Sequence, residues 1–428
     1  MHSLIRIMII LSFAMACDLF YIFVDTELKY APIVLPSIAA LSFAVARGFR
    51  LNRPRWATWA FLIMFLYALP GLLYNKLSGE PASLFTAVFL SAVIWCAQLV
   101  PLEKLRIDPG QLLRGIERLG FCNLVSVCLT LVILDPTRYN TDLLRLHERS
   151  FLVPLSFGVA YLQRRWSAAA AAAALMAVVV YCDPRTTTIL AIAMTLVLLV
   201  IATLPREIRL PLLAIGVVVV PVISLDSYNV MKYVNRSFKE NMSSVDNSEF
   251  REERWAMAIR EFHRAPVFGK FFAGAGEYDH RLAHRYNHGA WPMDIDAFPL
   301  HNDYLEFLVD GGLVGLGLFT TGLIGCVGLG LKNYVAFERR RMSDFASLSL
   351  IMSITLITAM QAIAVNPVMN ASPCGFFVYL AAALIIVIDR YHTHSSAMAH
   401  QESNVSRTGI WEHGCTSQQV GCVPLRRW

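Results

Sequence analysis

The residues best suited to catalysis stand at the edge of an apolar run in a chain of 428 residues. In the stretch FPLHNDYLEFLVDGGLVGLGLF, residues 298–319, His301 immediately precedes that run. Asp303, Glu306 and Asp310 follow at a spacing that places them on one stripe of a helix. A histidine at a helix N-terminus lies near the positive end of the helix dipole, which favours the neutral imidazole that a general base requires. His301 is therefore a candidate base; the alternative is an interfacial histidine that hydrogen-bonds a neighbouring loop.

A second set of candidates consists of arginines whose guanidinium groups suit a phosphate. Arg185 lies in the short segment YCDPRTTTIL between two apolar runs, where it is either a snorkelling membrane anchor or a phosphate ligand. Arg251 and Arg254 lie in NSEFREERWAMAIREFHRAPVFG, which has the pattern of an amphipathic helix ended by Pro266. Its apolar residues at helical spacing are Phe250, Trp255, Ile259 and Phe262. Nearby glutamates could pair several arginines, yet the excess predicts a basic outer face that suits a phosphorylated ligand.

Three histidines support a competing hypothesis of a metal site. His280, His284 and His288 recur at every fourth position and would share one helix face. Zinc would still need a carboxylate or water as fourth ligand, and the chain has no HExxH pattern. The sequence also lacks a Walker A loop, a GxGxxG pattern and a serine-centred nucleophile elbow. We therefore predict no metal, no cofactor and no nucleotide hydrolysis.

Membrane-spanning helices must position these candidates, because the chain is 56% hydrophobic and only 16% charged. Its mean hydropathy is +0.52, and apolar runs of roughly 17 to 25 residues recur along it. We predict an all-α, polytopic integral membrane protein with about twelve transmembrane helices. The expected spans lie near residues 4–24, 31–47, 57–75, 83–102, 119–135, 151–163, 166–182, 186–204, 209–225, 303–331, 345–365 and 371–389. The sixth is short, so a total of about eleven is the alternative.

The basic residues of the short connections predict how these spans are oriented. With the N-terminus inside, the even-numbered connections carry most of them: Arg47, Arg50, Arg53, Arg55, Lys104, Arg106, Arg114, Arg118, Arg164, Arg165, Arg206, Arg209, Lys332 and Arg339–Arg341. The short odd-numbered loops carry fewer, with Arg138, Arg145 and Arg149 as their one cluster. Both termini are therefore predicted to be cytoplasmic.

The same pattern divides the chain into four parts. Residues 1–225 are predicted to form an N-terminal transmembrane bundle of about nine spans, and residues 226–300 a large outer loop with amphipathic helices. Residues 301–390 carry the C-terminal spans, and residues 391–428 form a polar tail predicted to be disordered.

Small residues predict two places of close packing. A helix from His301 to Leu331 would be about 45 Å long, so its first turns would project beyond the hydrocarbon core. Gly311 and Gly312 are expected to kink this helix or to let another element approach it closely. The alanine-rich stretch WSAAAAAAALM, residues 166–176, is expected to pack tightly against neighbouring helices.

One motif resembles the superfamily of bacterial O-antigen ligases and polymerases. His301–Asn302, nine intervening residues and then Gly312-x-x-Gly315 are similar to the ligase signature in the last large periplasmic loop and the span after it. That signature commonly continues with threonine, where this chain has Leu316. The resemblance covers roughly residues 180–390, while the N-terminal spans match only in hydropathy.

A second motif strengthens the resemblance. The segment FREERWAMAIREFHRAPVFG follows the superfamily's order of an arginine, three residues, a tryptophan, and then a proline and a glycine. The matching positions are Arg251, Trp255, Pro266 and Gly269. Arg185 is a third match, similar to the Ser-Arg pair that opens an inner span.

The resemblance implies a GT-C-like, metal-independent glycosyltransferase of the bacterial inner membrane whose active site faces the periplasm. Its donor would be a glycan on undecaprenyl pyrophosphate and its acceptor a sugar hydroxyl of lipid A-core. Membrane lipids would surround it, and no nucleic acid partner is expected.

The resemblance also implies roles for individual residues. His301 would take the proton of the acceptor hydroxyl. Arg185 and Arg251 would bind the pyrophosphate, with Arg254 in reserve because the helix register is uncertain by one residue. Asn302 and Tyr304, beside His301, are further candidates for substrate binding.

Two other functions stay open. An O-antigen or exopolysaccharide polymerase belongs to the same superfamily and would use the same site, but the His-Asn-x9-Gly-x-x-Gly motif favours a ligase. A lipid-linked oligosaccharide flippase would place ionisable residues along the spans and show matching halves. Here the ionisable residues concentrate at the outer ends of the spans and in one asymmetric loop, so a flippase is the more distant alternative.

Overall fold

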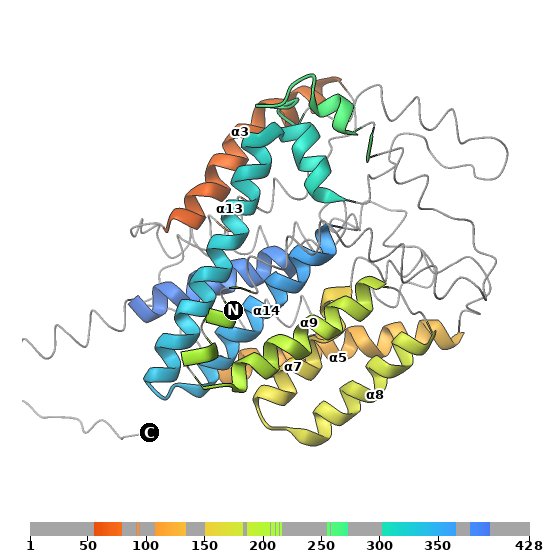
Figure 1. The fold of residues 1–428 in the computed structure, drawn as a ribbon, viewed down its shortest axis with the longest axis vertical. Helices are drawn as coiled ribbons and strands as arrows, with labels where there is room; N and C mark the ends of the chain where they lie inside the picture. The colour runs from red at the N-terminus through yellow and green to blue at the C-terminus, as the bar shows by residue number, and fades with distance from the viewer. Residues whose placement is uncertain are drawn as a thin grey trace, which may run out of the picture.

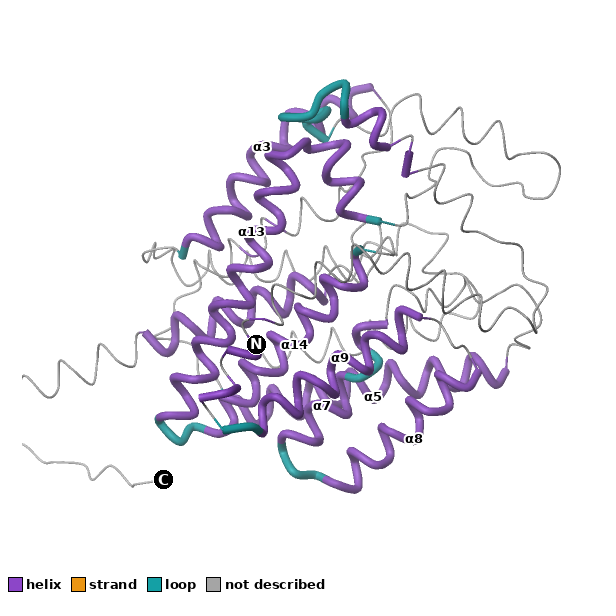
Figure 2. Tube along the Cα trace, viewed as in Figure 1, coloured by secondary structure: helices purple, strands orange, loops and turns teal. Residues whose placement is uncertain are grey.

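The structure, a computed structural model, describes part of the chain, and all of the regular structure in that part is helical. The described residues are 55–78, 91, 94, 108–133, 150–182, 186–205, 207–209, 211–213, 215, 255–256, 258–272, 302–364 and 377–393. Figure 2 shows helices joined by short turns, with no strand among the described residues. The all-α fold predicted from composition is confirmed over these residues.

The helices follow the apolar runs of the sequence. They are α3 (Trp56–Ser78), α5 (Pro109–Ile133), the 3-10 helix η4 (Ser150–Leu152), α7 (Leu155–Leu162), α8 (Trp166–Cys182), α9 (Thr186–Thr203), α13 (Asp303–Arg339) and α14 (Ser343–Ile363). Residues 377–393 form a further helix. The predicted spans near 57–75, 166–182, 186–204 and 345–365 coincide with α3, α8, α9 and α14. The predicted sixth span contains α7, whose 8 residues extend only about 12 Å.

Length and composition identify two helices among the described residues that could cross a membrane. They are Asp303–Arg339 and Ser343–Ile363, and shorter apolar helices lie at Trp56–Gly71, Trp166–Tyr181 and Thr188–Thr203. These apolar helices fit the membrane protein predicted from composition. The total of about twelve spans depends on residues outside the described ranges and stays a prediction, as do the four domain boundaries.

The structure corrects the prediction of one extended helix from His301 to Leu331. Within α13, Gly312 has φ 62° and ψ −165°, which breaks the helix into a short leg, residues 303–311, and a long leg, residues 313–339. Figure 1 shows the two legs meeting at a sharp angle at the upper end of the molecule. The predicted helix length of about 45 Å is therefore wrong, because Gly312 takes a backbone conformation that ends one helical leg and begins another at a sharp angle. The predicted kink at Gly311–Gly312 is confirmed.

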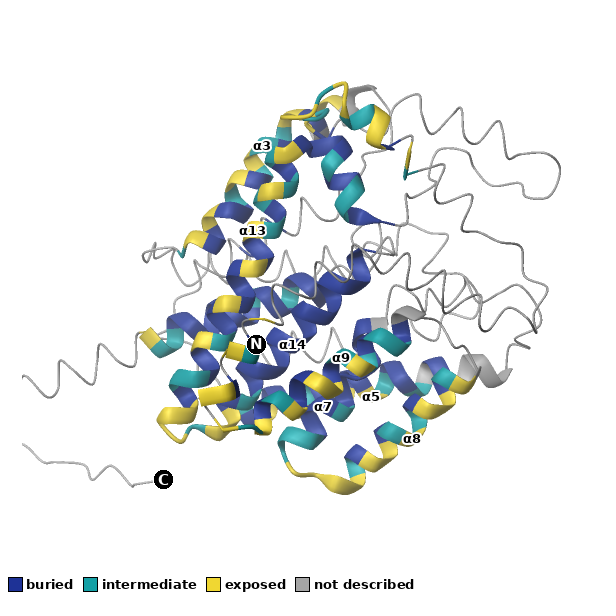
Figure 3. Ribbon diagram, viewed as in Figure 1, coloured by how far each residue is buried: buried dark blue, intermediate teal, exposed yellow. Residues whose placement is uncertain are grey.

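The core lies where α14 and the long leg of α13 meet their neighbours. Buried aromatic and aliphatic side chains such as Phe61, Phe319, Leu323 and Leu356 form one continuous cluster. Figure 3 shows α14 buried along its length, whereas α8 alternates buried and exposed residues. On α8, Ala169 and Ala172 are buried, so the predicted packing role of its alanines is confirmed for one face.

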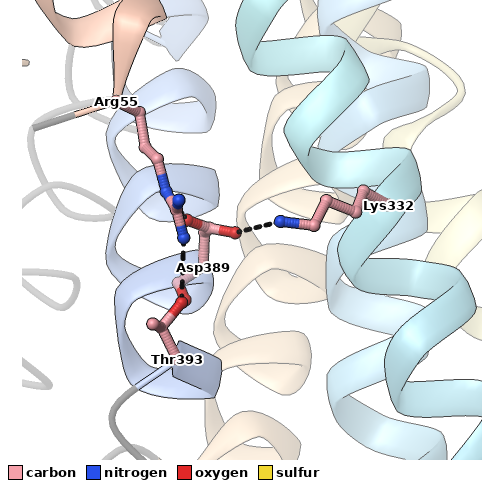
Figure 4. Close-up of polar contacts among 4 residues, drawn as sticks. All are labelled: Arg55, Lys332, Asp389 and Thr393. Carbon is pink, nitrogen blue, oxygen red and sulfur yellow. Dashed lines mark hydrogen bonds and ion pairs between the residues drawn. The ribbon is translucent and has the colours of Figure 1, made fainter.

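Three arginine–carboxylate pairs lie away from the Gly312 kink: Arg55–Asp389, Arg165–Glu117 and Arg209–Glu338. Figure 4 shows Asp389 between Arg55 and Lys332, at 2.6 Å from Arg55 Nε and 3.7 Å from Lys332 Nζ. Arg209 donates hydrogen bonds to Glu338 from both terminal guanidinium nitrogens, Nη1 at 2.9 Å and Nη2 at 2.6 Å. The turns between α7 and α8 and between α13 and α14 lie at the lower end of the molecule in Figure 1. The described connections predicted to share one side of the membrane thus lie together, while the identity of that side stays a prediction.

Candidate functional site

The structure describes two of the six predicted site residues. Asn302 and Tyr304 are described, whereas His301, Arg185, Arg251 and Arg254 lie outside the described residues. The three histidines of the rival metal site, 280, 284 and 288, also lie outside them. Within the described ranges, no group of three His, Cys, Asp or Glu residues could hold a metal ion. The catalytic, phosphate-binding and metal predictions therefore stay predictions.

Asn302 fixes the start of the short leg of α13. Its backbone is extended, with φ −159° and ψ 98°, and its buried side-chain oxygen accepts a hydrogen bond from Leu305 N at 3.1 Å. This is the standard N-cap arrangement, which satisfies one of the free N–H groups of the first turn. The helix therefore begins at Asp303, and His301 directly precedes the cap in the sequence. The structure assigns Asn302 a capping role, while its predicted contact with substrate is untested.

Tyr304 ties the short leg to α14. Its hydroxyl donates a hydrogen bond to the carbonyl of Met360 at 3.1 Å, and its ring lies 6.2 Å from that of Phe319 on the long leg. A hydroxyl donated to a backbone carbonyl and a packed ring both restrict the side chain. Tyr304 thus holds the helix start in place, and its predicted role in substrate binding is untested.

The acidic stripe predicted from the sequence faces the protein interior. Asp303 is fully buried, Glu306 is 5% exposed and Asp310 is 2% exposed. Asp303 and Glu306 lie in the first turn of the helix, where negative charge complements the positive end of the helix dipole. Burial of three acids on one short helix is costly and is typical of a site with a role beyond packing. The first turn of α13 therefore places buried acidic side chains near the positive end of the helix dipole.

The break at Gly312 leaves backbone groups of α13 without partners inside the helix, and the loop of residues 266–272 forms hydrogen bonds with them. The carbonyl of Asp310 accepts hydrogen bonds from the N–H groups of Lys270, at 2.8 Å, and Phe272, at 3.0 Å. On the other side of the break, Leu313 N donates to the carbonyl of Pro266 at 2.9 Å. Val314 N likewise donates to the loop, at 3.1 Å. Broken helices leave such groups without intrahelical partners, so the 266–272 loop completes the kink.

Glycines allow the loop and the kink to approach each other this closely. Gly269 has φ 56°, and a Cβ there would lie 2.6 Å from the carbonyl oxygen of Asp310. A Cβ on Gly312 would collide with the carbonyl of Val267. Only glycine adopts the backbone angles of Gly312 without strain and also leaves room for the loop. These two glycines belong to the two separate motifs of the sequence, so the structure brings the motifs into direct contact.

Phe272 explains why glycines stand at positions 311 and 315. Its ring lies over the helix at Gly311 and Gly315, where a Cβ would come within 2.7 and 3.2 Å of the ring. The ring also packs edge-on against Phe307 at 5.8 Å, and Phe307 stacks on Phe319 at 4.0 Å. The Gly312-x-x-Gly315 spacing thus combines one glycine for the kink with one for the aromatic ring. Sequence reasoning did not identify Phe272, which looks like one more aromatic in an apolar segment.

Tyr67 of α3 also contacts both the 266–272 loop and α13 at the kink. Its hydroxyl lies at the carbonyls of Phe268 and Gly311, the latter at 3.1 Å. Its ring is 5.1 Å from Phe271 and 6.2 Å from Phe272. Sequence reasoning missed this residue, although a tyrosine in the middle of an apolar run is a hydroxyl in need of a partner.

The segment before the loop packs on the short leg of α13. Ala258 is fully buried with Val309, and Phe262 and Leu305 pack against this pair. The predicted amphipathic helix is confirmed at residues 255–256 and 258–262, and it ends before Pro266. Its buried face was misassigned at Ile259, which is 45% exposed, because Ala258 takes the packing position. The arginine-bearing motif and the histidine-bearing motif are thus anchored to each other by their described residues.

Ion pairs hold the end of this helix to the loop. Glu261 lies 2.6 Å from Arg264 and 2.8 Å from Lys270. Burial raises the pKa of Glu261, but Lys270 and Arg264 together lower it by more, so its pKa lies below the usual range. The expectation that glutamates pair some arginines of this segment is confirmed for Arg264.

Comparison with known protein families finds a match over the region that contains both motifs. No curated protein matches the chain. Residues 170–320 match the family model described as O-antigen ligase. The interval includes the Trp255–Gly269 segment, the N-cap at Asn302 and the Gly312-x-x-Gly315 kink. This match supports the family assignment that the two motifs predict, to the O-antigen ligase family.

Proposed function

We propose that this protein is an O-antigen ligase that transfers a glycan from undecaprenyl pyrophosphate to a sugar hydroxyl of lipid A-core. The family match supports a glycosyltransferase of the O-antigen ligase or polymerase type that uses lipid-linked glycans. The apolar helices and the match together indicate a membrane protein. In the proposal, the active site faces the periplasm from the bacterial inner membrane.

The observation that carries the proposal is the contact between the two motifs at Gly269 and Gly312. This contact fixes the short leg of α13, at whose start Asn302 caps the helix immediately after His301. It also anchors the helix that follows Arg251 and Arg254 in the sequence. A rigid support of this kind is what a transferase needs to hold a base and an anion-binding group in register.

In the proposed reaction, His301 takes the proton of the acceptor hydroxyl. The acceptor oxygen forms a bond to the anomeric carbon of the glycan, and the bond from that carbon to the pyrophosphate oxygen breaks. The electron pair of the broken bond leaves with the undecaprenyl pyrophosphate. Arg185 and Arg251, with Arg254 in reserve, stabilise the negative charge on this leaving group.

One feature of the structure and one general property of arginine suit this chemistry. The N-terminus of the short leg presents the positive end of a helix dipole, which favours the neutral imidazole at the residue before the cap. The planar fork of arginine binds two phosphate oxygens at once, which replaces a metal ion in charge compensation. The proposal therefore requires no metal ion or cofactor.

The test is a deletion strain complemented with the wild-type gene and examined by gel electrophoresis of lipopolysaccharide. Loss of a ligase leaves core-only molecules while long lipid-linked glycan accumulates. Loss of a polymerase leaves core that bears a single repeat unit, and this pattern would replace the ligase proposal by the polymerase alternative. A flippase is distinguished by purified protein, because a flippase forms no glycosidic bond in detergent solution.

A further inference from the structure

The exposed side of α3 is apolar along the helix. Figure 3 shows exposed residues at intervals over the whole of α3, and their helical spacing places them on one stripe. From residue 56 to residue 73 they are Trp56, Trp59, Ile63, Leu66, Pro70 and Leu73. None of them carries a charge, whereas a helix face that meets water carries charged and polar residues. The stripe therefore requires an apolar neighbour along its length.

Aromatic side chains stand at both ends of this stripe. Trp56 and Trp59 lie at one end, and Tyr74, which is 60% exposed, lies at the other. The helix from Trp56 to Tyr74 is about 27 Å long, close to the roughly 30 Å of a hydrocarbon core. Tryptophan and tyrosine are enriched at the two membrane–water interfaces. A bilayer thus fits the stripe in length and in composition, with one interface at the level of Tyr74.

The 266–272 loop lies against α3 near the Tyr74 end. Tyr67, two helical turns before Tyr74, has its ring 5.1 Å from that of Phe271, and Phe271 stacks on Phe268 at 6.0 Å. Phe268 is 53% exposed, and Phe271 and Val267 are exposed as well. A stacked aromatic pair that stays open to the surroundings continues the apolar surface of α3 onto the loop.

The surroundings of the loop are those of an interfacial segment. Leu313 of α13, whose N–H donates to the carbonyl of Pro266, is also exposed and extends the apolar surface. The charged side chains Arg264 and Lys270 both pair with Glu261. Basic residues beside exposed aromatic and aliphatic side chains are typical of segments that lie in the plane of the membrane interface.

Ring contacts within α13 give the start of its short leg a position relative to the loop. Tyr304 and Phe307 both contact Phe319 of the long leg, at 6.2 and 4.0 Å between ring centroids. Phe319 lies seven residues beyond Gly312, which is about 10 Å along the helix. The short leg therefore turns back beside the long leg, as Figure 1 shows. Its first turn lies roughly 10 Å from the kink, on the side of the spans.

We propose that the 266–272 loop is seated in the membrane interface, with Val267, Phe268 and Phe271 in contact with phospholipid acyl chains. With the loop at this level, the first turn of α13 lies within the depth of the same leaflet. The lipid contact does not depend on the proposed reaction, because a ligase and a polymerase would share it. If the proposed function holds, the depth explains why the glycan donor carries a lipid chain.

The experiment introduces the photo-crosslinking residue p-benzoylphenylalanine at one position of the full chain in vesicles of phosphatidylcholine and phosphatidylglycerol. Phe268 and Val267 are replaced in separate variants, so that the test survives if one of them fails to fold. After irradiation, mass spectrometry of the protein is expected to show the added mass of one phospholipid at either position. Ile63, in the middle of the α3 stripe, is the positive control. Arg260, exposed on the preceding helical segment, should yield at least about fivefold less lipid adduct.

Alkaline cleavage of the lipid esters then reports the depth of the contact. A fatty-acid mass is expected to remain on the protein at Phe268 and Val267, while retention of the headgroup alone would overturn the contact with acyl chains. Absence of adduct at both loop positions, with adduct at Ile63, would also overturn the proposal. A crosslink to a second copy of the chain in place of lipid would assign this surface to a dimer and overturn it as well. Because transfer is not measured, these outcomes are separate from failure of the proposed function.

Discussion

The contacts that join separate helices differ between the Gly312 kink and the far end of α13. At the Gly312 kink, four backbone hydrogen bonds join the 266–272 loop to α13, and glycines make the approach possible. At the opposite end, side-chain ion pairs such as Arg209–Glu338 and Arg55–Asp389 join helix termini. Backbone contacts of the first kind fix position tightly, since neither partner has rotamers to change. Ion pairs of the second kind fasten helices but tolerate small shifts of them.

This difference predicts separate consequences for function and for stability. A substitution at the kink moves the helix that begins after His301, so it affects transfer as well as folding. A substitution in the ion pairs affects stability while the helix start stays in place.

The largest effect is expected from Gly312→Ala. The substitution combines an unfavourable φ of 62° with a collision at the carbonyl of Val267, so it should lower the free energy of unfolding by about 3 kcal/mol. Thermal unfolding in detergent and glycan transfer in the deletion strain measure the two consequences. Gly317→Ala is the matched control on the same helix, because a Cβ at Gly317 meets nothing within 4 Å. Equal behaviour of the two variants would disprove the role of the kink.

The second-largest loss of stability is expected from Arg209→Met. The side chain of Arg209 is 7% exposed, and it binds Glu338, the hydroxyl of Tyr334 and the carbonyl of Ala202. Its loss should lower the free energy of unfolding by about 2 kcal/mol, since Glu338 is partly exposed and keeps some hydration. Transfer per folded molecule should remain near the wild-type level. Arg264→Gln, at an arginine whose side chain is 72% exposed, should have little effect on unfolding. A loss of transfer without a loss of stability in Arg209→Met would contradict the proposed division.

How much of this arrangement the sequence could predict is clear from particular residues. Gly311–Gly312 was recognisable as a kink, and the helix begins at Asp303, two residues after the predicted start at His301. The sharpness of the angle at Gly312 was not predictable, because adjacent glycines in an apolar run fit a mild bend equally well. The contact between Gly269 and Gly312 was also hidden, because local patterns carry no information about pairing across more than forty residues.

Side-chain partners in distant helices escaped prediction for the same reason. Arg209 and Glu338 were visible only as charges near helix ends, and Tyr67 only as a tyrosine within an apolar run. Ile259 was misassigned because helical periodicity favours large apolar residues, whereas the close approach at Val309 needs the small side chain of Ala258.

Tyr67→Phe should have a smaller effect, confined to the kink. The change removes the hydroxyl from the carbonyls of Phe268 and Gly311 but keeps the ring contacts with Phe271 and Phe272. The free energy of unfolding should fall by about 1 kcal/mol, the usual net value of one hydrogen bond. Thermal unfolding of Tyr67→Phe beside Tyr181→Phe, at a residue that is 89% exposed, checks this. If Tyr67→Phe left the free energy of unfolding unchanged, the ring contacts alone would hold α3 to the loop.

The smallest effect should come from the Glu261 ion pairs and should depend on pH. The pKa of Glu261 is lower in the folded protein than in the unfolded chain, because Lys270 and Arg264 outweigh its burial. Its contribution to stability is therefore present above the unfolded pKa and is lost as pH falls through the folded pKa. The difference in unfolding midpoint between wild type and Glu261→Gln should be present at pH 7 and should vanish in acid. A difference that grows in acid would contradict the sign of this pKa shift.

The most direct test of the central proposal is glycan transfer by His301→Ala in the deletion strain, at an expression level equal to wild type. We predict core-only lipopolysaccharide and accumulated lipid-linked glycan, with a thermal unfolding midpoint like that of wild type, because Asn302 still caps the helix. Normal transfer by a folded His301→Ala protein would contradict the assignment of the general base.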